Sequence, residues 1–334
     1  MHTKSRRREL SSPTAPEIPP GGGTPDIADA LPAFSRPDPG GHASATETEV
    51  TEPALRTRVR EPLPRDASLL PPAGEAFDAA LDGALVQLAL ELTPGMRAAI
   101  DAQARLLVAW NAHVNLTAIR GAGAIALEHV ADSLSAVPLL LDLLADRGAR
   151  RRAVRLLDLG SGAGYPGIPV AVAVPVAAAA LVDSVAKKTA FLDVAAAAAG
   201  HAIRAAGEEP PALRAVRSRA EDLGRDPAHR GRWDVVTGRA VAPMPALVEL
   251  ALPLLRRGGV LVAWKRDPGD GSLEAEMDEA RTLLLPLGAS PAVRVERVSL
   301  AGLEDHRLVV VTKHAPTPPR FPRPAHRLGR PPEF

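Results

Sequence analysis

The stretch Asp158-Leu-Gly-Ser-Gly-Ala-Gly164 begins at the end of an apolar run, residues 154–159, and is followed closely by Pro166-Gly-Ile-Pro169. The apolar run has the character of a buried strand, and the segment after the glycines has that of a helix start. Glycine lets the backbone turn sharply from strand to helix and come within contact distance of a ligand. The stretch therefore predicts a ligand-binding loop at the carboxyl edge of a sheet.

The segments around this loop predict an α/β fold. Strands are expected at residues 153–159, 179–183, 215–218, 234–237 and 260–264, with helices between the first four and over 244–255. Strands separated by helices imply right-handed crossovers and a mostly parallel, doubly wound sheet. A helix over 272–287 then precedes two strand-like runs, 292–298 and 307–312. A short polar loop joins these runs into a C-terminal antiparallel hairpin, which completes a seven-stranded sheet.

One acidic residue indicates the class of ligand. Asp183 ends the second expected strand, nineteen residues past Gly164. This is close to the ~20-residue spacing at which a carboxylate accepts hydrogen bonds from a ribose. The loop and the acid together predict an adenosine-bearing cofactor. The alternative is a tight turn with an unrelated surface aspartate.

The glycine spacing favours S-adenosyl-L-methionine as that cofactor. It is Gly160-x-Gly162-x-Gly164 with Asp158 two residues earlier, not the Gly-x-Gly-x-x-Gly fingerprint of dinucleotide-binding folds. S-adenosyl-L-methionine has no pyrophosphate, so it demands no free helix start to hold one. The terminal hairpin and a helical segment before the first strand are also typical of Rossmann-like class I methyltransferases rather than of dehydrogenases. A nicotinamide-dependent oxidoreductase is the alternative.

Two different segments precede the sheet. Residues 1–75 are rich in Pro, Gly, Ser, Thr and charge, which predicts a disordered extension, with a tethering or regulatory role as the alternative. Helical periodicity begins at Ala76, and a second helix is expected from the cap Thr93-Pro94 to about Asn111. A third is expected over 124–146. Residues 76–150 are thus expected to form a small helical subdomain ahead of a cofactor-binding domain at 151–315.

Composition excludes several kinds of chemistry. The 334 residues include no cysteine, which excludes disulfides, thiolate zinc sites and cysteine nucleophiles and favours a reducing cytoplasm. No metal site is expected. The formal net charge is only +1, so any RNA contact must come from a local patch. The longest apolar run, 167–182, is broken by two prolines and falls short of the ~20 residues of a membrane helix, so no membrane partner is expected. The first residues lack the pattern of a secretory signal.

The end of the chain is locally basic. From Lys313 onward five Lys and Arg residues oppose one Glu, which gives a local net charge of +4. A basic, proline-rich tail of this kind, residues 316–334, suits contacts to RNA phosphates. The alternative is a solubilising, frayed terminus.

Several short sequence strings over residues 76–325 together form a recognisable pattern. They are Trp110-Asn111; Asn115-Leu-Thr-Ala-Ile119; His129 with Asp132-Ser-Leu134; Leu157-Asp-Leu-Gly-Ser-Gly-Ala-Gly-Tyr-Pro-Gly-Ile-Pro169; Asp183-Ser184 with Lys187-Lys188 and Phe191-Leu192; Arg219-Ala-Glu-Asp222; and Gly238-Arg-Ala240. In these strings the chain resembles the 16S ribosomal RNA guanine-N7 methyltransferase family RsmG, also called glucose-inhibited division protein B. The glycine string with its Tyr-Pro-Gly-Ile-Pro ending and Asn115-Leu-Thr117 are the most specific.

The resemblance implies an activity, a partner and a set of site residues. The activity is S-adenosylmethionine-dependent formation of 7-methylguanosine in the 530 loop of 16S rRNA, on a small ribosomal subunit precursor, by a monomeric enzyme. Arg239 and Asn115 are the expected catalytic residues. The expected cofactor-binding residues are Gly160, Gly162, Gly164 and Tyr165 in the loop, Asp183 at the ribose, Ala220 and Glu221 at the adenine, and Arg239 at the mouth of the site. The chain departs from the family at Thr237 and at Trp264-Lys-Arg266.

The chemistry of guanine N7 asks little of the side chains. N7 carries an in-plane lone pair and no proton, so it can attack a sulfonium methyl without a general base, and positioning is the task of the enzyme. Methylation of pyrimidine carbon 5 needs a cysteine, and exocyclic adenine amines are held by an Asn/Asp-Pro-Pro-aromatic motif where this chain has Gly238-Arg-Ala-Val-Ala242. Arginine suits guanine because its planar fork donates to O6. Another RNA or small-molecule methyltransferase, or a non-catalytic RNA- or ribosome-binding protein, are the alternatives.

Overall fold

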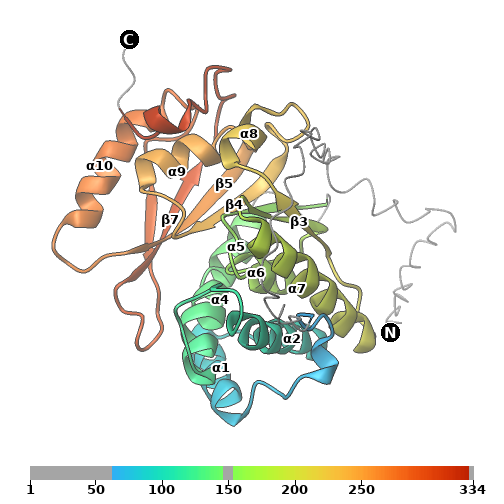
Figure 1. Ribbon diagram of the computed structural model, residues 1–334. Helices are drawn as coiled ribbons and strands as arrows, with labels where there is room; N and C mark the ends of the chain where they lie inside the picture. The colour runs from blue at the N-terminus through green and yellow to red at the C-terminus, as the bar shows by residue number, and fades with distance from the viewer. Residues whose placement is uncertain (1–61, 146–152, 331–334) are drawn as a thin grey trace, which may run out of the picture.

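The computed structural model describes residues 62–145 and 153–330, in which a seven-stranded sheet lies between two layers of helices (Figure 1). The strand order is β3-β2-β1-β4-β5-β7-β6, with β7 antiparallel to both of its neighbours and the other pairs parallel. The expected fold class, including the terminal hairpin, is confirmed. The strands are β1 (Arg155–Leu159), β2 (Ala178–Asp183), β3 (Ala212–Arg217), β4 (Trp233–Arg239), β5 (Leu255–Arg266), β6 (Arg294–Arg297) and β7 (His306–Thr312). The helices are η2 (Ala67–Leu69), α1 (Glu75–Leu88), α2 (Pro94–Asn111), α3 (Ala122–Ala124), η3 (Ile125–Ala131), α4 (Asp132–Leu134), α5 (Val137–Ala145), α6 (Gly167–Ala173), α7 (Ala186–Ala205), α8 (Ala220–Arg225), α9 (Met244–Ala251), α10 (Ser272–Leu284) and η5 (Ala325–Arg327).

Alternation along the strands divides the apolar side chains between two cores. In β1, Leu156 belongs to the core beneath α1, α2, α6 and α7, whereas Leu157 and Leu159 belong to the core beneath α8, α9 and α10. This is the two-residue period of a strand that is covered on both faces. Phe77 and Trp110 from the expected helical subdomain lie in the same core as Leu156, and α2 packs on α6 and α7, the helices that cover this face of the sheet.

The first two helices follow their sequence signals. The Thr93 side chain accepts a hydrogen bond from the Met96 backbone N–H at 3.2 Å, and Pro94 stands in the first turn of α2. Helix α1 ends at Leu88 because Ala89 adopts a left-handed conformation with φ 50°, so Leu90 lies outside the helix.

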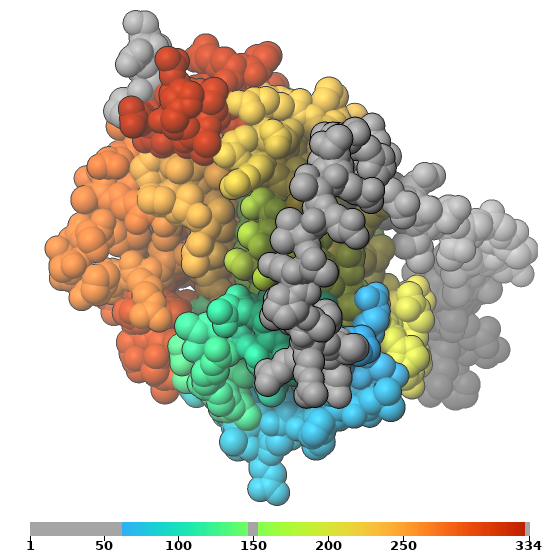
Figure 2. Space-filling model, in the orientation of Figure 1, coloured from blue at the N-terminus to red at the C-terminus, as the bar shows by residue number. Residues whose placement is uncertain are grey.

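The third expected helix contains a feature that periodicity did not indicate. Its middle, η3, is a π-helical segment, and such segments are frequent at functional sites. By length and composition the stretch Ala122–Ala145 could cross a membrane, but 67% of its most apolar window is buried inside the protein, as in a core helix. The tip of the β6–β7 hairpin lies against this part of the molecule, where Gly302 approaches Leu127 (Figure 2).

The expected extension needs a correction at its end. Residues 1–61 lie outside the described part of the chain, but residues 62–74 pack against α2. Trp110 Nε1 donates to the Pro64 carbonyl at 2.7 Å, Arg105 reaches the Ala67 and Leu70 carbonyls, and Ala67 is buried. The segment is held through its main-chain carbonyls, which every residue has, so its composition gave no indication that it is packed on α2.

Strand β5 begins five residues earlier than expected. Leu255 pairs with Trp233, and a register shift then separates this pair from the one between Val235 and Val260. Gly258 lies in the irregular part with φ 80°, a left-handed conformation that favours glycine. Two arginines and two glycines in a row look like a turn in the sequence, which is why residues up to 255 were expected to be helical.

The basic tail is also corrected, because up to residue 330 it is docked on the protein. Phe321 is fully buried, and Arg230 donates to the carbonyls of Thr317, Pro318 and Phe321. Arg323 forms a two-bond ion pair with the fully buried Glu249 of α9. Up to residue 330 the segment is therefore not a frayed end, and contacts of its exposed Arg320, Arg327 and Arg330 with RNA phosphates stay a prediction.

We expect Arg323→Ala to destabilise the protein by roughly 3–5 kcal/mol, because it leaves the buried Glu249 carboxylate without its cation. Urea unfolding measures the effect. The matched control is Arg281→Ala, which removes an exposed ion pair with Asp278 and should cost less than about 1 kcal/mol. Equal losses in the two variants would contradict a structural role for the tail.

Candidate active site

Asp158, the acid before the glycines, is fully buried at the end of β1. Its carboxylate accepts hydrogen bonds from the Ser161 hydroxyl in the loop and from Thr237 Oγ1 in β4, the latter at 2.6 Å. It also accepts from the Gly167 backbone N–H in α6 at 3.2 Å, and a Cβ at position 167 would lie 2.6 Å from it. Burial raises the pKa of Asp158 to about 6, although these hydrogen bonds favour its ionised form. One side chain thus ties together the strand, the loop, the next helix and the neighbouring strand.

The glycine loop turns through three left-handed residues. Gly160, Gly162 and Gly164 have φ of 64°, 57° and 83°, a region that other residues rarely adopt. A Cβ on Gly160 would also lie 2.9 Å from a methyl group of Val241. The loop after β1 therefore touches the loop after β4, at the point where the strand order reverses and ligands of such sheets bind.

The carboxyl ends of β2 and β3 continue this edge. The Asp183 carboxylate, 6% exposed, accepts from the Gly162 N–H at 3.1 Å and from the Val185 N–H at 2.8 Å. Each of its oxygens keeps a lone pair that a ribose hydroxyl can use. Ala220 and Glu221, both half-buried, begin α8 at the end of the next strand. Because β1, β2 and β3 are neighbours, these residues fit an adenosine laid across the three strand ends.

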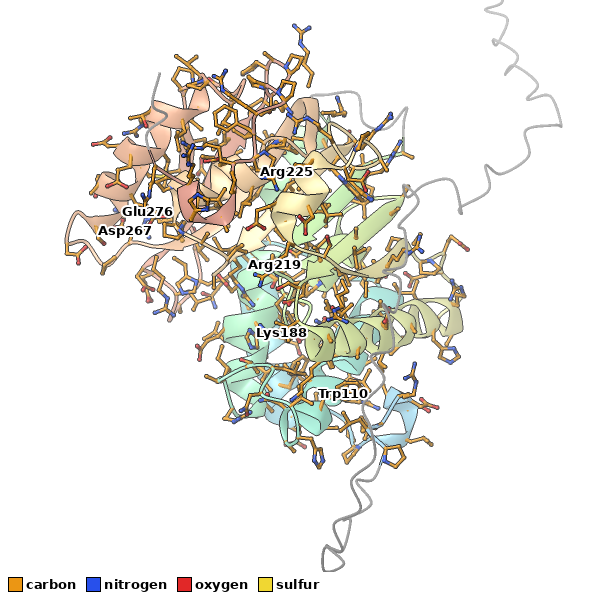
Figure 3. All side chains as sticks on the ribbon, turned by 45° about the horizontal axis from the view of Figure 1, so that its top comes forward. Trp110, Lys188, Arg219, Arg225, Asp267 and Glu276 are labelled. Atoms are coloured by element: carbon orange, nitrogen blue, oxygen red, sulfur yellow. The ribbon has the colours of Figure 1, made fainter. Side chains whose placement is uncertain are left out.

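Other residues support or flank this edge. Gln103 of α2 donates from Nε2 to the Ala163 carbonyl at 2.9 Å, so a helix of the first segment braces the loop. Lys188 Nζ lies 3.9 Å from Asp183 Oδ2, and Arg219 is the N-cap residue of α8 (Figure 3). Lys187 is exposed. Of the lysine pair, only Lys188 is thus placed at the expected ribose site.

A cavity of about 490 Å³ opens beside the loop, at the carboxyl ends of β4 and β5. This volume is within the range of small-molecule sites. Arg239 ends β4 and lines the cavity, and Ala240 follows it with a left-handed φ of 55°. Strained backbone of this kind is concentrated at functional sites. The remaining lining residues are Ile119, Glu128, His129, Asp132, Trp264, Lys265, Arg266, Glu276 and His306.

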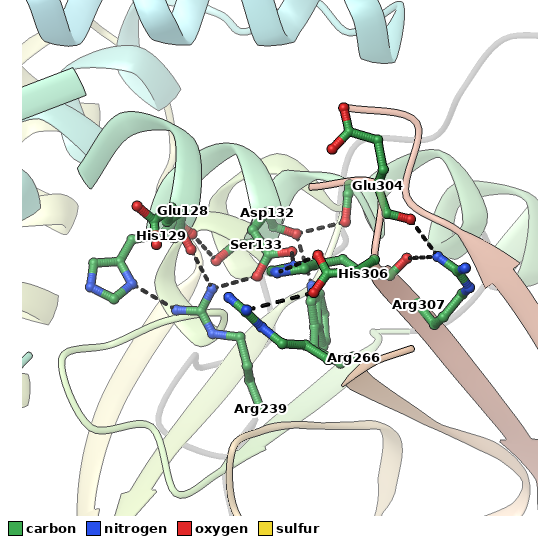
Figure 4. A network of polar contacts seen from close by, with 12 residues as sticks. Glu128, His129, Asp132, Ser133, Arg239, Arg266, Glu304, His306 and Arg307 are labelled. Carbon is green, nitrogen blue, oxygen red and sulfur yellow. Dashed lines mark hydrogen bonds and ion pairs between the residues drawn. The ribbon is translucent and has the colours of Figure 1, made fainter. Parts of the chain in front are cut away.

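Three acceptors from η3 and α4 hold the Arg239 guanidinium (Figure 4). Nη1 donates to the Glu128 carbonyl at 3.0 Å and to Asp132 Oδ2 at 2.7 Å, and Nη2 lies 3.0 Å from His129 Nδ1. An arginine offers five donors in a rigid plane. The N–H on Nε and one N–H on Nη2 have no partner among the described residues. The clamp therefore fixes the plane of the guanidinium and leaves two donors unused.

His129 is neutral in this arrangement. Burial, together with the charge of Arg239, lowers its pKa to about 3. Because Arg239 donates to Nδ1, the ring proton is on Nε2, which lies 2.8 Å from Thr117 Oγ1. The ring also stacks on Tyr165, with centroids 4.7 Å apart and planes 6° apart. His129 is thus a positioning group that links the loop to the cavity, a role that its place on an apolar helix did not indicate.

The loop after α2 supports His129 from the other side. Asn111 accepts from the Leu116 and Thr117 N–H groups and donates to the Thr117 carbonyl. This loop also carries Ile119, which lines the cavity. Asn115, expected to be catalytic, is exposed and does not line the cavity. Tyr165, expected at the cofactor, is buried, and its hydroxyl has no partner among the described residues.

Three residues of the cavity wall, Asp132, Trp264 and His306, were given no role in the sequence analysis. Asp132 Oδ1 lies 2.8 Å from His306 Nδ1, and the Asp132 carbonyl accepts from Trp264 Nε1 at 2.8 Å. Lys265 is paired with Glu276 of α10. Asp132 stands three residues after His129 in the helix, a spacing that places both on one face and could have suggested it. His306 begins β7 after a surface turn, where no pattern distinguished it.

The arrangement offers hydrogen-bond donors and an aromatic wall beside an adenosine-binding edge. Gly160, Gly162, Gly164 and Asp183 come together, Ala220 and Glu221 extend their row, and Arg239 faces the adjoining cavity. Such a site can hold a nucleoside cofactor next to a planar, acceptor-bearing substrate. Its polar groups act as fixed dipoles and charges, and the absence of cysteine excludes a thiolate nucleophile.

Residues 96–287 match the family GidB, described as rRNA small subunit methyltransferase G. Similar proteins include three with the name Ribosomal RNA small subunit methyltransferase G. The one from Roseiflexus castenholzii is 40% identical over 217 residues, which is 65% of this chain and 83% of the relative. The one from Desulfitobacterium hafniense is 36% identical over 247 residues, 74% and 93% of the two chains. The one from Streptococcus pyogenes is 35% identical over 225 residues, 67% and 86%.

The buried Asp158 predicts a pH dependence of stability. Its pKa is raised from 3.8 to about 6, so between these values the folded protein holds a proton that the unfolded chain lacks. This contribution is fully present below about pH 4 and is lost as the pH rises through about 6. The free energy of unfolding of the wild type, relative to Asp158→Asn, should therefore fall by roughly 3 kcal/mol between pH 4 and pH 7. Urea unfolding of both proteins measures it, and parallel pH profiles would contradict the assignment.

Proposed function

The chain belongs to the rRNA small subunit methyltransferase G family, and we propose that it methylates N7 of a guanine in the 530 loop of 16S rRNA. The family makes it an S-adenosyl-L-methionine-dependent methyltransferase of small-subunit rRNA. The observation that carries the finer proposal is the clamped Arg239, which lines a cavity beside the glycine loop and keeps two donors without a partner among the described residues. Those donors match the O6 acceptor of guanine.

We assign the cofactor to the row of strand ends. Asp183 binds the ribose hydroxyls, Ala220 and Glu221 flank the adenine, and the turn of Gly160, Gly162 and Gly164 leaves the methionine portion room beside β4. The adenosine fit rests on the oriented Asp183 carboxylate and on the left-handed loop. Tyr165 follows the same loop, and its ring stacks on His129 and so helps to orient that side chain.

The bound cofactor supplies a sulfonium methyl group, and the residues of this chain supply position. Arg239 orients the base through O6 and leaves the adjacent N7 free. No residue has to remove a proton, because N7 carries a lone pair and no hydrogen. Orientation of two reactants at near-attack distance accounts for roughly 7–11 kcal/mol of barrier lowering, so positioning can supply most of the catalysis.

The sequence around the site supports guanine N7 over other acceptor atoms of nucleobases. Cysteine-dependent methylation of carbon 5 is excluded, because the chain has no cysteine. After β4 the chain carries Gly238-Arg-Ala240, not an amine-binding Asn/Asp-Pro-Pro-aromatic motif. We further propose that the substrate is the small-subunit precursor, that the enzyme acts as a monomer without a membrane partner, and that it works in the cytoplasm. Asn115 stays a proposed catalytic residue, which would have to reach the base from its exposed loop.

The proposal is tested by incubating the protein with a labelled methyl donor and 16S rRNA, or small subunits, that lack the modification. The label is then mapped by nucleotide. We expect it on N7 of one guanine in the 530 loop. Label on another atom, or none, would overturn the proposal.

We expect Arg239→Ala to lower kcat/KM for rRNA by roughly 10²–10³-fold, because it removes the donors aimed at the base. Arg239→Lys should be nearly as impaired, since a point charge cannot meet three acceptors and still donate to O6. Calorimetric affinity for S-adenosylhomocysteine should change little, which separates base positioning from cofactor loss. Arg281→Ala is the control. Wild-type turnover in both Arg239 variants would remove Arg239 from the site.

A further inference from the structure

A second histidine in the cavity wall, His306, has a polar atom without a hydrogen-bond partner among the described residues. His306 is 8% exposed and lines the cavity, and its Nε2 has no hydrogen-bond partner in the described part of the chain. Its other nitrogen, Nδ1, lies 2.8 Å from Asp132 Oδ1. Buried polar atoms in native proteins are nearly always paired, so an exception in a cavity wall points to a ligand.

Asp132 fixes which ring nitrogen carries the proton. A carboxylate only accepts hydrogen bonds, so His306 Nδ1 is the donor in that contact. In the neutral ring Nε2 then carries a lone pair and is an acceptor. The nearest carboxylate to Nε2 is Asp305, whose Oδ1 is 3.8 Å away and too far to pair with it. The same Asp132 carboxylate holds Arg239 through its second oxygen, at 2.7 Å.

One carboxylate therefore orients an arginine that donates and a histidine that accepts, and both line one cavity (Figure 4). We propose that His306 is a specificity-determining residue, which accepts a hydrogen bond from N1–H of the target guanine while Arg239 donates to O6. This inference rests on the proposed function. Guanine offers an acceptor at O6 beside a donor at N1, whereas adenine offers a donor at N6 beside an acceptor at N1. Adenine thus meets a mismatch at both positions, although it too has an N7 lone pair.

The proposed contacts at O6 and N1 are compatible with methyl transfer to N7. O6 lies between N1 and N7 on the guanine ring, so contacts at O6 and N1 leave N7 uncovered. Trp264, whose Nε1 is fixed by the Asp132 carbonyl, adds an aromatic surface to the same cavity. Asp132 is accordingly a positioning residue: it orients Arg239 and His306, which contact the base, and does not contact the base itself.

A weak ion pair lies next to the histidine. Arg266 Nη1 and Asp305 Oδ2 are 3.6 Å apart, and 67% and 39% of these side chains are exposed. Exposed pairs of this kind contribute little to stability, so an entering base displaces this one at little cost. Arg266 then becomes available to a phosphate of the same RNA.

The test compares His306→Asn with the wild type on rRNA carrying guanine or adenine at the mapped target. The asparagine amide nitrogen replaces Nδ1 and keeps the bond to Asp132, but nothing replaces the acceptor at Nε2. We expect kcat/KM for the guanine substrate to fall roughly tenfold to a hundredfold, and the preference for guanine over adenine to fall with it. Affinity for S-adenosylhomocysteine and the thermal unfolding midpoint should stay at wild-type values. His314→Asn, an exposed histidine outside the cavity, is the matched control.

The outcomes separate the two proposals. If the wild type does not methylate guanine N7, the proposed function fails. If it does, and His306→Asn keeps wild-type turnover and preference, the inference about His306 is overturned. If His306→Asn loses stability or cofactor affinity, His306→Gln decides, because its amide oxygen can replace Nε2 while the bond to Asp132 is lost. A guanine preference retained in His306→Gln supports the inference, and a lost preference refutes it.

Discussion

The hydrogen bonds to the buried Asp158 carboxylate are the constraint on which the site depends. A carboxylate buried at the end of β1 is costly unless hydrogen-bond donors surround it. Those donors come from the loop, from α6 and from β4. To supply them, the chain has to reverse through three left-handed glycines and bring the start of α6 directly onto the strand. The shape of the loop is therefore a consequence of satisfying one side chain. The open edge at Asp183 and the contact with Val241 follow from that shape.

A second carboxylate organises the substrate side. Asp132 sits in a helix whose middle is π-helical, and it faces Arg239 and His306 with one oxygen each. His129, one turn earlier, stacks on Tyr165 of the glycine loop and accepts from Arg239. The N-terminal helices are thus part of the candidate site, because η3 and α4 orient the arginine at the end of β4. A separate accessory subdomain could not do this.

The sequence was sufficient for whatever repeats with a period or a spacing. Strand alternation and the Thr93 cap predicted the sheet and the helix start, because each depends on local backbone geometry. The spacing from Gly164 to Asp183 placed this acid at the glycine loop, where it accepts from the Gly162 N–H, and its contact with a cofactor stays a prediction. The cavity was only half predictable. Arg239 was found through its string, but its partner Asp132 and the remote His306 are joined by a contact across 174 residues. Residues 62–74 and the tail are held in place by hydrogen bonds to their main-chain carbonyls, and the tail also by the ion pair with Glu249. Such contacts leave no pattern in composition.

The anchoring of the tail has a consequence for synthesis of the chain on the ribosome. Glu249 is buried, and its ion-pair partner Arg323 is added to the growing chain 74 residues later. At about 5–20 residues per second this interval lasts roughly 4–15 s, during which α9 carries a carboxylate that is costly to bury without its partner. The half of the sheet covered by α8, α9 and α10 therefore completes its packing late, whereas the half covered by α1, α2, α6 and α7 can form while translation continues. The packing of α9 thus depends on a residue that is translated 74 positions after the carboxylate that it neutralises.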